Sequence, residues 1–366
     1  MVKTPDNVHV IVLAGGPGTR LWPISSDKLP KPYLAIPGPR TLIEETVARA
    51  RKLAPPNRVW VVALKEQLPL LRKYLPKMDE CQWLLEPEAR NTAAAIAFGT
   101  AAILKRDPEA IIAVTPADHV VSEPDALVGA LAKAARFCED EYGIVCVGIK
   151  PTEPATGYGY LAMGKKKNHG VHQLKRFIEK PKHAKAKDLV KKGALWNAGM
   201  FVFKGEVLIN ELEQHLPELH APLAAALSAK TEAATRKQLL SNYEKLPKIS
   251  IDYAVMEKTK HACAIKCACG WSDVGTWTEA LRVSGGKIES ENGTARWMRD
   301  GEVVCGETGK LTAALGFGKA ILVEGPGGRL ILHPDAASSV GDVAKEAAKI
   351  QSLAKKPAKK SKKKKA

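Results

Sequence analysis

The chain has 366 residues, of which 45% are hydrophobic and 26% are charged, and its formal net charge is +17. These values are typical of an ordinary soluble globular protein with about two domains. No apolar stretch reaches the roughly 18–20 residues of a membrane span, and the N-terminus lacks the pattern of a signal peptide. Seven scattered cysteines form no disulfide framework, so we expect reduced thiols and a cytoplasmic location.

Much of the positive charge lies in the C-terminal tail. Residues 355–366, with the sequence KKPAKKSKKKKA, contain eight lysines and no acidic residue, so +9 remains on the rest of the chain. A block of like charge without apolar residues cannot offset the entropy of ordering, and we expect a disordered tail. It could contact polyanions non-specifically, or it could be a solvated tail that aids solubility. We expect no specific nucleic-acid partner.

Strands and helices alternate over the first 150 residues. The predicted strands are Val8–Leu13, Arg58–Ala63, Gln82–Leu85, Ala110–Thr115 and Ile144–Gly148. The predicted helices are Thr41–Leu53, which begins with a capping-box pattern, Thr92–Lys105 and Asp125–Phe137. This alternation predicts an α/β domain with a mainly parallel sheet. Ligands bind beyond the carboxyl ends of such strands, so we expect residues 14–32, 86–92 and 116–119 to meet there.

The remainder of the chain changes character near residue 285. Before it we expect strands at Gln173–Glu179, Met200–Phe203 and Ala262–Cys267, and helices near 183–192, 205–228 and 250–258. After it, short strands separated by glycine-rich turns predict a small β-rich domain that is closed by a helix near 340–354. The expected domains are therefore 1–284 and 285–354, followed by the tail 355–366.

The first predicted strand runs into a glycine-rich turn, LAGGPGTRLWP, at residues 13–23. Such a turn suggests backbone held close to phosphate. The spacing fits neither the P-loop nor the dinucleotide fingerprint, because no Lys-Ser or Lys-Thr follows and Leu21 stands where the third glycine is required. The turn ends instead in a cation, Arg20, and a second cation, Lys31, follows between two prolines.

Two aspartates are candidate metal ligands. Asp118 follows the strand Ala110–Thr115, and Asp273 lies between Gly270 and Gly275. Mg²⁺ favours one or two carboxylates together with phosphate oxygens. For each residue the alternative is an ordinary turn aspartate, or for Asp118 a helix cap.

Three further segments suit a phosphorylated sugar. Lys180, beside Glu179, lies at a strand end before a proline, where a surface ion pair is the alternative. TGYGY (156–160) and LWNAGMF (195–201) combine glycine with aromatic or amide side chains. Such combinations suit sugar hydroxyls and a sugar ring face, and buried packing of the aromatic rings is the alternative.

Eight segments together are much more specific than any one of them. They are LAGGPGTRLWPISSDKLPKPYL, EPEARNTAAAI, TPADHVV, TGYGYL, FIEKP, LWNAGMFVF, SIDYAVMEK and GWSDVGTW. In this order and at these intervals they resemble the mannose-1-phosphate guanylyltransferases, a branch of the sugar nucleotidyltransferases. The resemblance covers about residues 8–350 and looks like the short form, without the isomerase domain that is fused downstream in some relatives.

The resemblance implies a fold and a reaction. The fold is a Rossmann-like nucleotidyltransferase domain with a mainly parallel mixed sheet, followed by a small β-helix-like domain, and the assembly is a homodimer. The reaction converts GTP and α-D-mannose 1-phosphate into GDP-mannose and pyrophosphate, with Mg²⁺ as cofactor. The sugar phosphate attacks the α-phosphorus in line, and catalysis depends on positioning and charge neutralisation.

The resemblance also implies roles for residues. Arg20, Lys31 and Lys180 are the catalytic cations, and Asp118 and Asp273 bind the metal. The nucleotide-binding positions are Leu13, Ala14, Gly15, Gly16, Gly18, Thr19, Arg20, Lys31, Glu86, Asn91 and Asp118. The sugar-phosphate positions are Gly157, Glu179, Lys180 and Asn197.

Three positions remain open. The N–H donors of guanine suit an acceptor such as Glu86 or main-chain carbonyl groups. Asp252, in a helix that begins at Ser250, either reaches the site or belongs to the packing of that helix. Pro17 departs from the family pattern in offering no N–H to a phosphate, and the lysine tail has no counterpart there.

Two other functions compete with this one. The first is a nucleotidyltransferase for another sugar 1-phosphate or another nucleotide. The second is a non-catalytic protein that binds a nucleotide sugar or, through its tail, a polyanion. The second competes poorly, since a non-catalytic homologue has no reason to keep all of its charged site residues, which are Arg20, Lys31, Asp118, Lys180 and Asp273.

Overall fold

The computed structural model describes residues 3–16, 18–300, 302–305 and 311–354. Pro17 and the lysine tail 355–366 lie outside the described residues. The chain divides into two compact units, the first formed by Met1–Gly16 and Arg40–Asp273 and the second by Pro17–Pro39 and Val274–Ala366. The predicted domain boundary at residue 284 stays a prediction.

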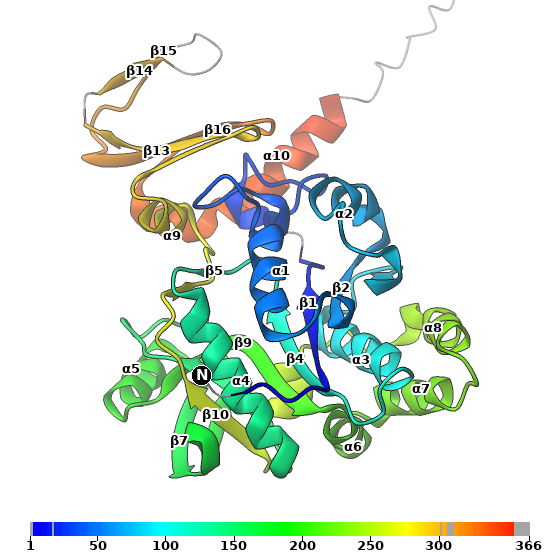
Figure 1. Cartoon of the computed structure of the whole chain (residues 1–366). Coiled ribbons are helices and arrows are strands. Elements are labelled where there is room, and N and C mark those ends of the chain that lie inside the picture. Colours follow the sequence, from blue (N-terminus) through cyan, green and yellow to red (C-terminus); the bar gives the residue numbers. More distant parts are fainter. Residues whose placement is uncertain (1–2, 17, 301, 306–310, 355–366) are drawn as a thin grey trace, which may run out of the picture. The chain divides into compact units, whose positions relative to one another are not determined.

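A nine-stranded sheet forms the centre of the first unit (Figure 1), in the order β3-β2-β1-β4-β9-β6-β10-β8-β7. Neighbours pair parallel from β3 to β4 and between β6 and β10, whereas β9 and β8 run antiparallel to their neighbours. The strands are β1 Val8–Leu13, β2 Val59–Leu64, β3 Trp83–Glu86, β4 Ile111–Pro116, β6 Ile144–Ile149, β7 Tyr160–Lys166, β8 Val171–Ile178, β9 Leu195–Lys204 and β10 Ala262–Lys266. The predicted α/β domain with a mixed sheet is confirmed.

Strand β1 shows why its residues form a central strand. Its apolar side chains do not alternate with polar ones, because both faces of a central strand are covered by helices. Val10, Ile11 and Val12 are all buried. Ile11 lies against Gly99 so closely that a Cβ there would come within 2.6 Å of its Cδ1 atom.

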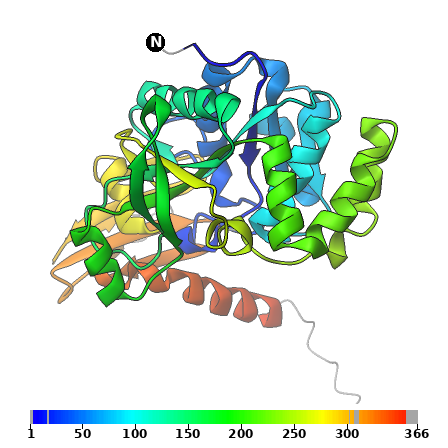
Figure 2. The ribbon, with the colours of Figure 1, turned by 90° about the horizontal axis from the view of Figure 1, so that it is seen from below.

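Helices cover both faces of the sheet (Figures 1 and 2). Helix α1 packs against α4 on one side, while α3 packs against α6, α7 and α8 on the other. The helices of this unit are α1 Leu42–Leu53, α2 Leu68–Tyr74, α3 Asn91–Leu104, α4 Pro124–Asp140, α5 His183–Lys191, α6 Gly205–His215, α7 Pro217–Leu227 and α8 Glu232–Leu240. The predicted capping box of α1 is confirmed, since Thr41 N donates to Glu44 Oε2 at 2.8 Å and Glu44 N donates to Thr41 Oγ1 at 3.4 Å.

The structure departs from the predicted elements at several places in this unit. The single helix expected near 205–228 is two helices, because α7 begins at Pro217, whose ring cannot continue α6. The helix expected near 250–258 contains a π-helical turn, Asp252–Met256. Strand β7 and helix α8 have no counterpart in the sequence analysis.

The second unit is β-rich, as the sequence predicts. Its main sheet has the order β12-β13-β16-β17, and β14 pairs with β15. All of these pairings are antiparallel, so the described part is built of hairpins and not of the stacked parallel coils of a β-helix. The elements are β12 Lys287–Ser290, β13 Gly293–Arg299, β14 Val303–Cys305, β15 Leu311–Ala313, β16 Lys319–Gly325, β17 Gly328–Leu332, α9 Trp277–Val283 and the predicted helix α10 Val340–Ala354.

Residues 18–39 pack within this second unit. The backbone N–H of Gly327 donates to the carbonyl of Pro23 at 3.0 Å, and Trp277 Nε1 donates to the carbonyl of Trp22 at 2.9 Å. Trp277 is completely buried. The segment that follows the glycine-rich turn is therefore held by the C-terminal part of the chain.

The carboxyl ends of β1, β3 and β4 lie at one edge of the nine-stranded sheet because these strands are parallel. A further two-stranded ladder joins β5 Val120–Val121 to β11 Trp271–Ser272, antiparallel, with Val120 opposite Ser272. Among the described residues, no helix is long and apolar enough to cross a membrane.

Candidate active site

The first half of the glycine-rich turn leaves the sheet at the end of β1. The backbone N–H of Ala14 donates to the carbonyl of Val62 at 2.8 Å, so the chain still follows the sheet edge beyond Leu13. A methyl group at Gly15 would lie 3.3 Å from Glu86 Oε2, whereas Gly16 is exposed with open space beside it. A close carboxylate therefore leaves little room for a side chain at Gly15.

The second half of the turn belongs to the second unit. Gly18 has φ +58°, and a Cβ at this position would overlap Lys31 Cβ and lie 2.7 Å from the Lys31 backbone nitrogen. Lys31 is buried, whereas Arg20, in the 3₁₀ turn Thr19–Leu21, is exposed. The structure thus packs the glycine turn directly on the residue that the sequence pairs with it as a second cation.

Helix α10 supports the turn that carries Arg20. A Cβ at Gly341, in the first turn of α10, would lie 3.6 Å from Arg20 Cγ and 3.9 Å from Thr19 Oγ1. The aliphatic stem of the arginine therefore lies along the start of the helix.

Glu86 ends strand β3 as a buried acid. Its Oε1 atom accepts a hydrogen bond from the hydroxyl of Tyr243, which is also buried. Burial raises the pKa of Glu86 to about 7, while the hydrogen bond from Tyr243 opposes this rise. The helix that follows begins at Asn91, whose backbone is left-handed at φ +66° and whose Oδ1 accepts from Thr92 N at 2.8 Å.

Asp118 and Asp273 flank the same end of the β5–β11 ladder. Val120 lies opposite Ser272 in this antiparallel pair, so Asp118 and His119 precede one strand and Asp273 follows the other at the same end of the ladder. The side chain of Asp118 is 31% exposed. The described residues contain no group of three or more side chains that could cage a metal. Two carboxylates at one end of this ladder, without a cage, suit Mg²⁺ that completes its shell with water and phosphate oxygens.

Aromatic side chains contact Asp273 and His119, the residue after Asp118. Tyr158 donates its hydroxyl proton to Asp273 Oδ1 at 2.7 Å, and its ring lies edge-on to Trp196 and Trp271. Trp271 Nε1 in turn donates to His119 Nδ1 at 3.1 Å. The motifs TGYGY, LWNAGMF and GWSDVGTW are therefore brought into contact, and their aromatic residues support carboxylates as well as packing.

The predicted sugar-phosphate residues form a second group. Strand β8 ends at Ile178, so Glu179 and Lys180 lie beyond it and their side chains need not point to opposite faces of the sheet. Lys180 Nζ lies 2.7 Å from Glu179 Oε1. The Glu179 side chain is 6% exposed, whereas that of Lys180 is 55% exposed. A Cβ at Gly159 would lie 2.5 Å from Glu179 Oε2, and Gly157 is exposed.

Asn197 and Asp252 complete this group. Asn197 N donates to the carbonyl of Gly159 at 2.8 Å, its Nδ2 donates to Asp252 Oδ1 at 3.1 Å, and its Oδ1 accepts from Gly199 N at 3.1 Å. Burial, together with the negative charge of Glu179, raises the pKa of Asp252 to about 6. From the sequence, Asp252 could either reach the site or belong to the packing of its helix, and the signal for a site role was its place in SIDYAVMEK.

Strained backbone marks the same positions. Among the described residues other than glycine, positive φ angles occur at Asn91, His169, Lys180 and Val274. Asn91 and Lys180 are themselves predicted site residues, and Val274 follows Asp273 directly. Left-handed backbone is costly for a branched side chain such as valine and clusters at functional sites.

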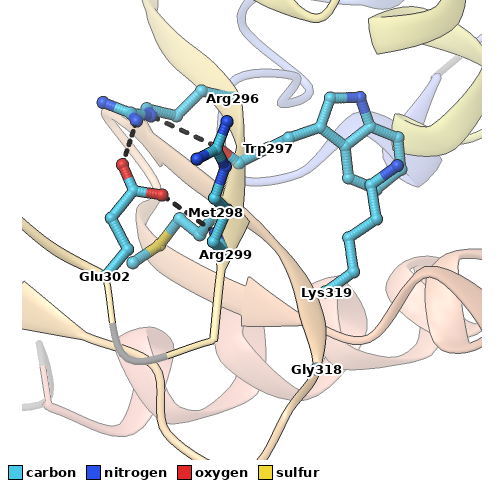
Figure 3. Close-up of a pocket in the computed structure, with 7 residues that line it drawn as sticks. All are labelled: Arg296, Trp297, Met298, Arg299, Glu302, Gly318 and Lys319. Atoms are coloured by element: carbon cyan, nitrogen blue, oxygen red, sulfur yellow. Dashed lines mark hydrogen bonds and ion pairs between the residues drawn. The ribbon is translucent and has the colours of Figure 1, made fainter.

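A cavity of about 810 Å³ lies elsewhere in the second unit (Figure 3), on strands β13 and β16. Arg296 pairs with Glu302 in its wall, and Lys319 Nζ lies 4.0 Å from the ring centroid of Trp297. None of the site residues predicted from the sequence lines it. We therefore do not assign it to the reaction.

Replacing Gly18 by alanine should destabilise the protein. The left-handed backbone and the overlap with Lys31 should lower the free energy of unfolding by about 1 to 3 kcal/mol. Thermal and denaturant unfolding measure this change. Gly38→Ala is the matched control because a Cβ at Gly38 meets open space, and equal effects of both substitutions would contradict the described packing.

Replacing Asp252 by asparagine should change how stability depends on pH. The folded protein binds the Asp252 proton more tightly than an unfolded chain does, so the stability it contributes at low pH is lost as the pH rises from about 4 to 6. Relative to Asp252→Asn, the unfolding free energy of the unchanged protein should fall by about 1 to 2 kcal/mol between pH 4 and pH 7.

Denaturant unfolding at several pH values measures the difference. Asp335→Asn serves as the control because the Asp335 side chain is 92% exposed. A constant difference between Asp252→Asn and the unchanged protein at all pH values would show that Asp252 ionises as it does in water.

Comparison with known proteins shows the family of the chain. A family model described as nucleotidyl transferase matches residues 9–289. The alginate biosynthesis protein AlgA of Pseudomonas fluorescens is 33% identical over 90% of this chain and 70% of its own length. The mannose-1-phosphate guanylyltransferase of Sinorhizobium fredii is also 33% identical, over 94% of this chain and 66% of its own length.

Structural comparison leads to the same family. A crystal structure from Thermus thermophilus, described as a mannose-1-phosphate geranyltransferase, matches with a TM-score of 0.79 and 31% identity, covering 93% of this chain and 99% of that one. The resemblance seen in the motifs is thereby confirmed, and the chain belongs to the nucleotidyl transferase family.

Proposed function

We propose that this nucleotidyltransferase transfers GMP from GTP to α-D-mannose 1-phosphate and releases pyrophosphate. The observation that carries the proposal is the grouping of Lys180, Glu179, Asn197 and Asp252 as a polar site for a sugar phosphate, in a chain that also has Asp118 and Asp273 at the same end of the β5–β11 ladder. One oxygen of the sugar phosphate attacks the α-phosphorus of GTP, and the bond from that phosphorus to the pyrophosphate oxygen breaks. No proton has to move for this exchange.

The nucleotide is bound mainly through backbone and cations. The turn from Leu13 to Thr19, with Ala14, Gly15, Gly16 and Gly18, brings backbone close to the phosphates. Arg20 and Lys31 neutralise the charge that develops on pyrophosphate as it leaves. The Glu86 carboxylate accepts hydrogen bonds from the N–H groups of guanine. Asn91 fixes the backbone at the start of α3.

The sugar phosphate is bound by a different set of side chains. Lys180 is the most exposed of them and meets the phosphate, while its contact with Glu179 sets its direction. Glu179, Asn197 and the backbone at Gly157 contact the sugar hydroxyls. Because Asn197 is held by three hydrogen bonds, its position is set before the substrate arrives.

Asp118 and Asp273 would hold Mg²⁺, which when bound neutralises phosphate charge and orients the reacting groups. The Tyr158 hydroxyl holds the Asp273 carboxylate, and Trp271 donates to His119, which follows Asp118 in the chain. We further propose a homodimer that works in the cytoplasm, as the family resemblance implies.

The first test is pyrophosphate release with a panel of substrates. GTP with mannose 1-phosphate and Mg²⁺ should give a kcat/KM at least roughly tenfold above that with glucose 1-phosphate or with ATP, UTP or dTTP. The coupled assay is run for every pair of sugar phosphate and nucleotide. Preferred turnover of another pair would replace the proposed substrates, and no turnover with any pair would favour a non-catalytic binding protein.

The second test concerns the metal ligands. Asp118→Asn should lower kcat by about a hundredfold or more, because the metal loses one of its two carboxylates. It should also raise the Mg²⁺ concentration at half-maximal rate. Asp125→Asn is the control, since this aspartate forms an exposed ion pair with Lys52. A near-normal rate and an unchanged Mg²⁺ titration in Asp118→Asn would remove Asp118 from the metal site.

A further inference from the structure

The contact between Glu86 and Tyr243 is used by no step of the reaction. We propose that Tyr243 is a positioning residue for nucleotide selection, whose hydroxyl orients the Glu86 carboxylate toward the N–H donors of the guanine base. This inference rests on the proposed function in one respect only, because it takes a guanine nucleotide as the ligand.

The two oxygens of Glu86 have different neighbours. Oε1 accepts the hydroxyl proton of Tyr243, whereas Oε2 lies on the side of Gly15, where a methyl group would come within 3.3 Å of it. The terminal torsion of a glutamate is otherwise broad and nearly two-fold. A hydrogen bond to one oxygen therefore decides which oxygen faces the glycine-rich turn.

Tyr243 is itself fixed from several directions. It lies in the 3₁₀ turn Tyr243–Lys245, is 1% exposed, and meets Phe98 edge-on with ring centroids 5.9 Å apart. Phe98 lies in α3, the helix that follows Glu86 in the chain. The tyrosine thus has no room to change rotamer without disturbing the core around α3.

The segment that follows Tyr243 also holds the loop after Glu86. Arg90 Nη1 donates to the carbonyl of Leu246 at 3.3 Å, and Ala93 N donates to the carbonyl of Ile249 at 3.2 Å. Ile251 N donates to Thr92 Oγ1 at 2.9 Å. These contacts join residues 243–251 to residues 86–93, and among them the tyrosine contact is the one that reaches the carboxylate.

Charge determines what Glu86 can recognise. Guanine presents N–H donors on its pairing edge, and an ionised carboxylate accepts from both. A protonated carboxyl group has a donor of its own and cannot accept in the same way. Burial favours the protonated form and raises the pKa of Glu86, while the Tyr243 hydroxyl favours the ionised form. The nearby cation Arg90 is already paired with Glu88.

The experiment measures nucleotide binding to the full-length protein as a function of pH. Isothermal titration calorimetry with MgGTP and MgITP, which lacks the 2-amino group, is carried out from pH 6 to pH 8, where the base keeps its N1–H donor. Tyr243→Phe should weaken MgGTP binding about fivefold to tenfold at pH 7, with recovery toward pH 8, because a larger fraction of Glu86 is protonated at the lower pH. It should weaken MgITP binding less, and kcat should change less than KM.

Two variants separate this from a structural role. Glu86→Gln cannot titrate, so the pH dependence that it retains belongs to other groups, including the phosphates. Tyr142→Phe, at a tyrosine that is 45% exposed, should bind like the unchanged protein. If Tyr243→Phe fails to fold, Glu86→Gln tests the carboxylate that Tyr243 orients, and an unchanged preference of this variant for MgGTP over MgITP would overturn the inference.

The outcomes of this test and of the substrate panel are distinct. An equal fall in affinity for MgGTP and MgITP at all pH values would show that Tyr243 only packs the core and would overturn the inference. Binding that follows the expected pH shift, without any turnover of mannose 1-phosphate, would support the inference while the proposed function fails.

Discussion

Parallel pairing of β1 with β2 and β4 is the constraint on which the remaining structure depends. It places the ends of β1, β3 and β4 at one edge of the sheet and leaves their connections to emerge there. The pairing is possible because both faces of these strands are apolar and are covered by helices. Polar chemistry is therefore confined to the loops at the sheet edge, where backbone and carboxylates can face a ligand.

The carboxylates of the candidate site have hydrogen-bond partners of two kinds, neutral donors and a cation. Asp273 is held by a tyrosine hydroxyl, Glu86 by another, and Asp252 by the amide of Asn197. Glu179 instead contacts a lysine. Neutral donors leave the negative charge of an acid largely in place, whereas a cation cancels it. For Glu86 the neutral donor opposes burial, which raises the pKa of this acid to about 7.

Elements that depend on local sequence patterns were predicted well. Val8–Leu13 was predicted to the residue, and the Thr41 capping box follows from its spacing alone. The partners of site residues were not predictable in the same way. Tyr243 follows helix α8, which no motif marks, and it reaches Glu86 across 157 positions. The register of the β5–β11 ladder likewise depends on long-range packing that periodicity does not encode.

The grouping of residues 18–39 with the C-terminal part of the chain has an evolutionary consequence. The turn with Arg20 and Lys31 rests on α10 and on the strands around Gly327, so these distant segments must change together. A recombination event that exchanged only the C-terminal part between two relatives would leave this turn on a foreign support. We therefore expect residues 18–39 and the segment that begins at Val274 to be inherited together. Most of the nine-stranded sheet lies between these two segments in the sequence.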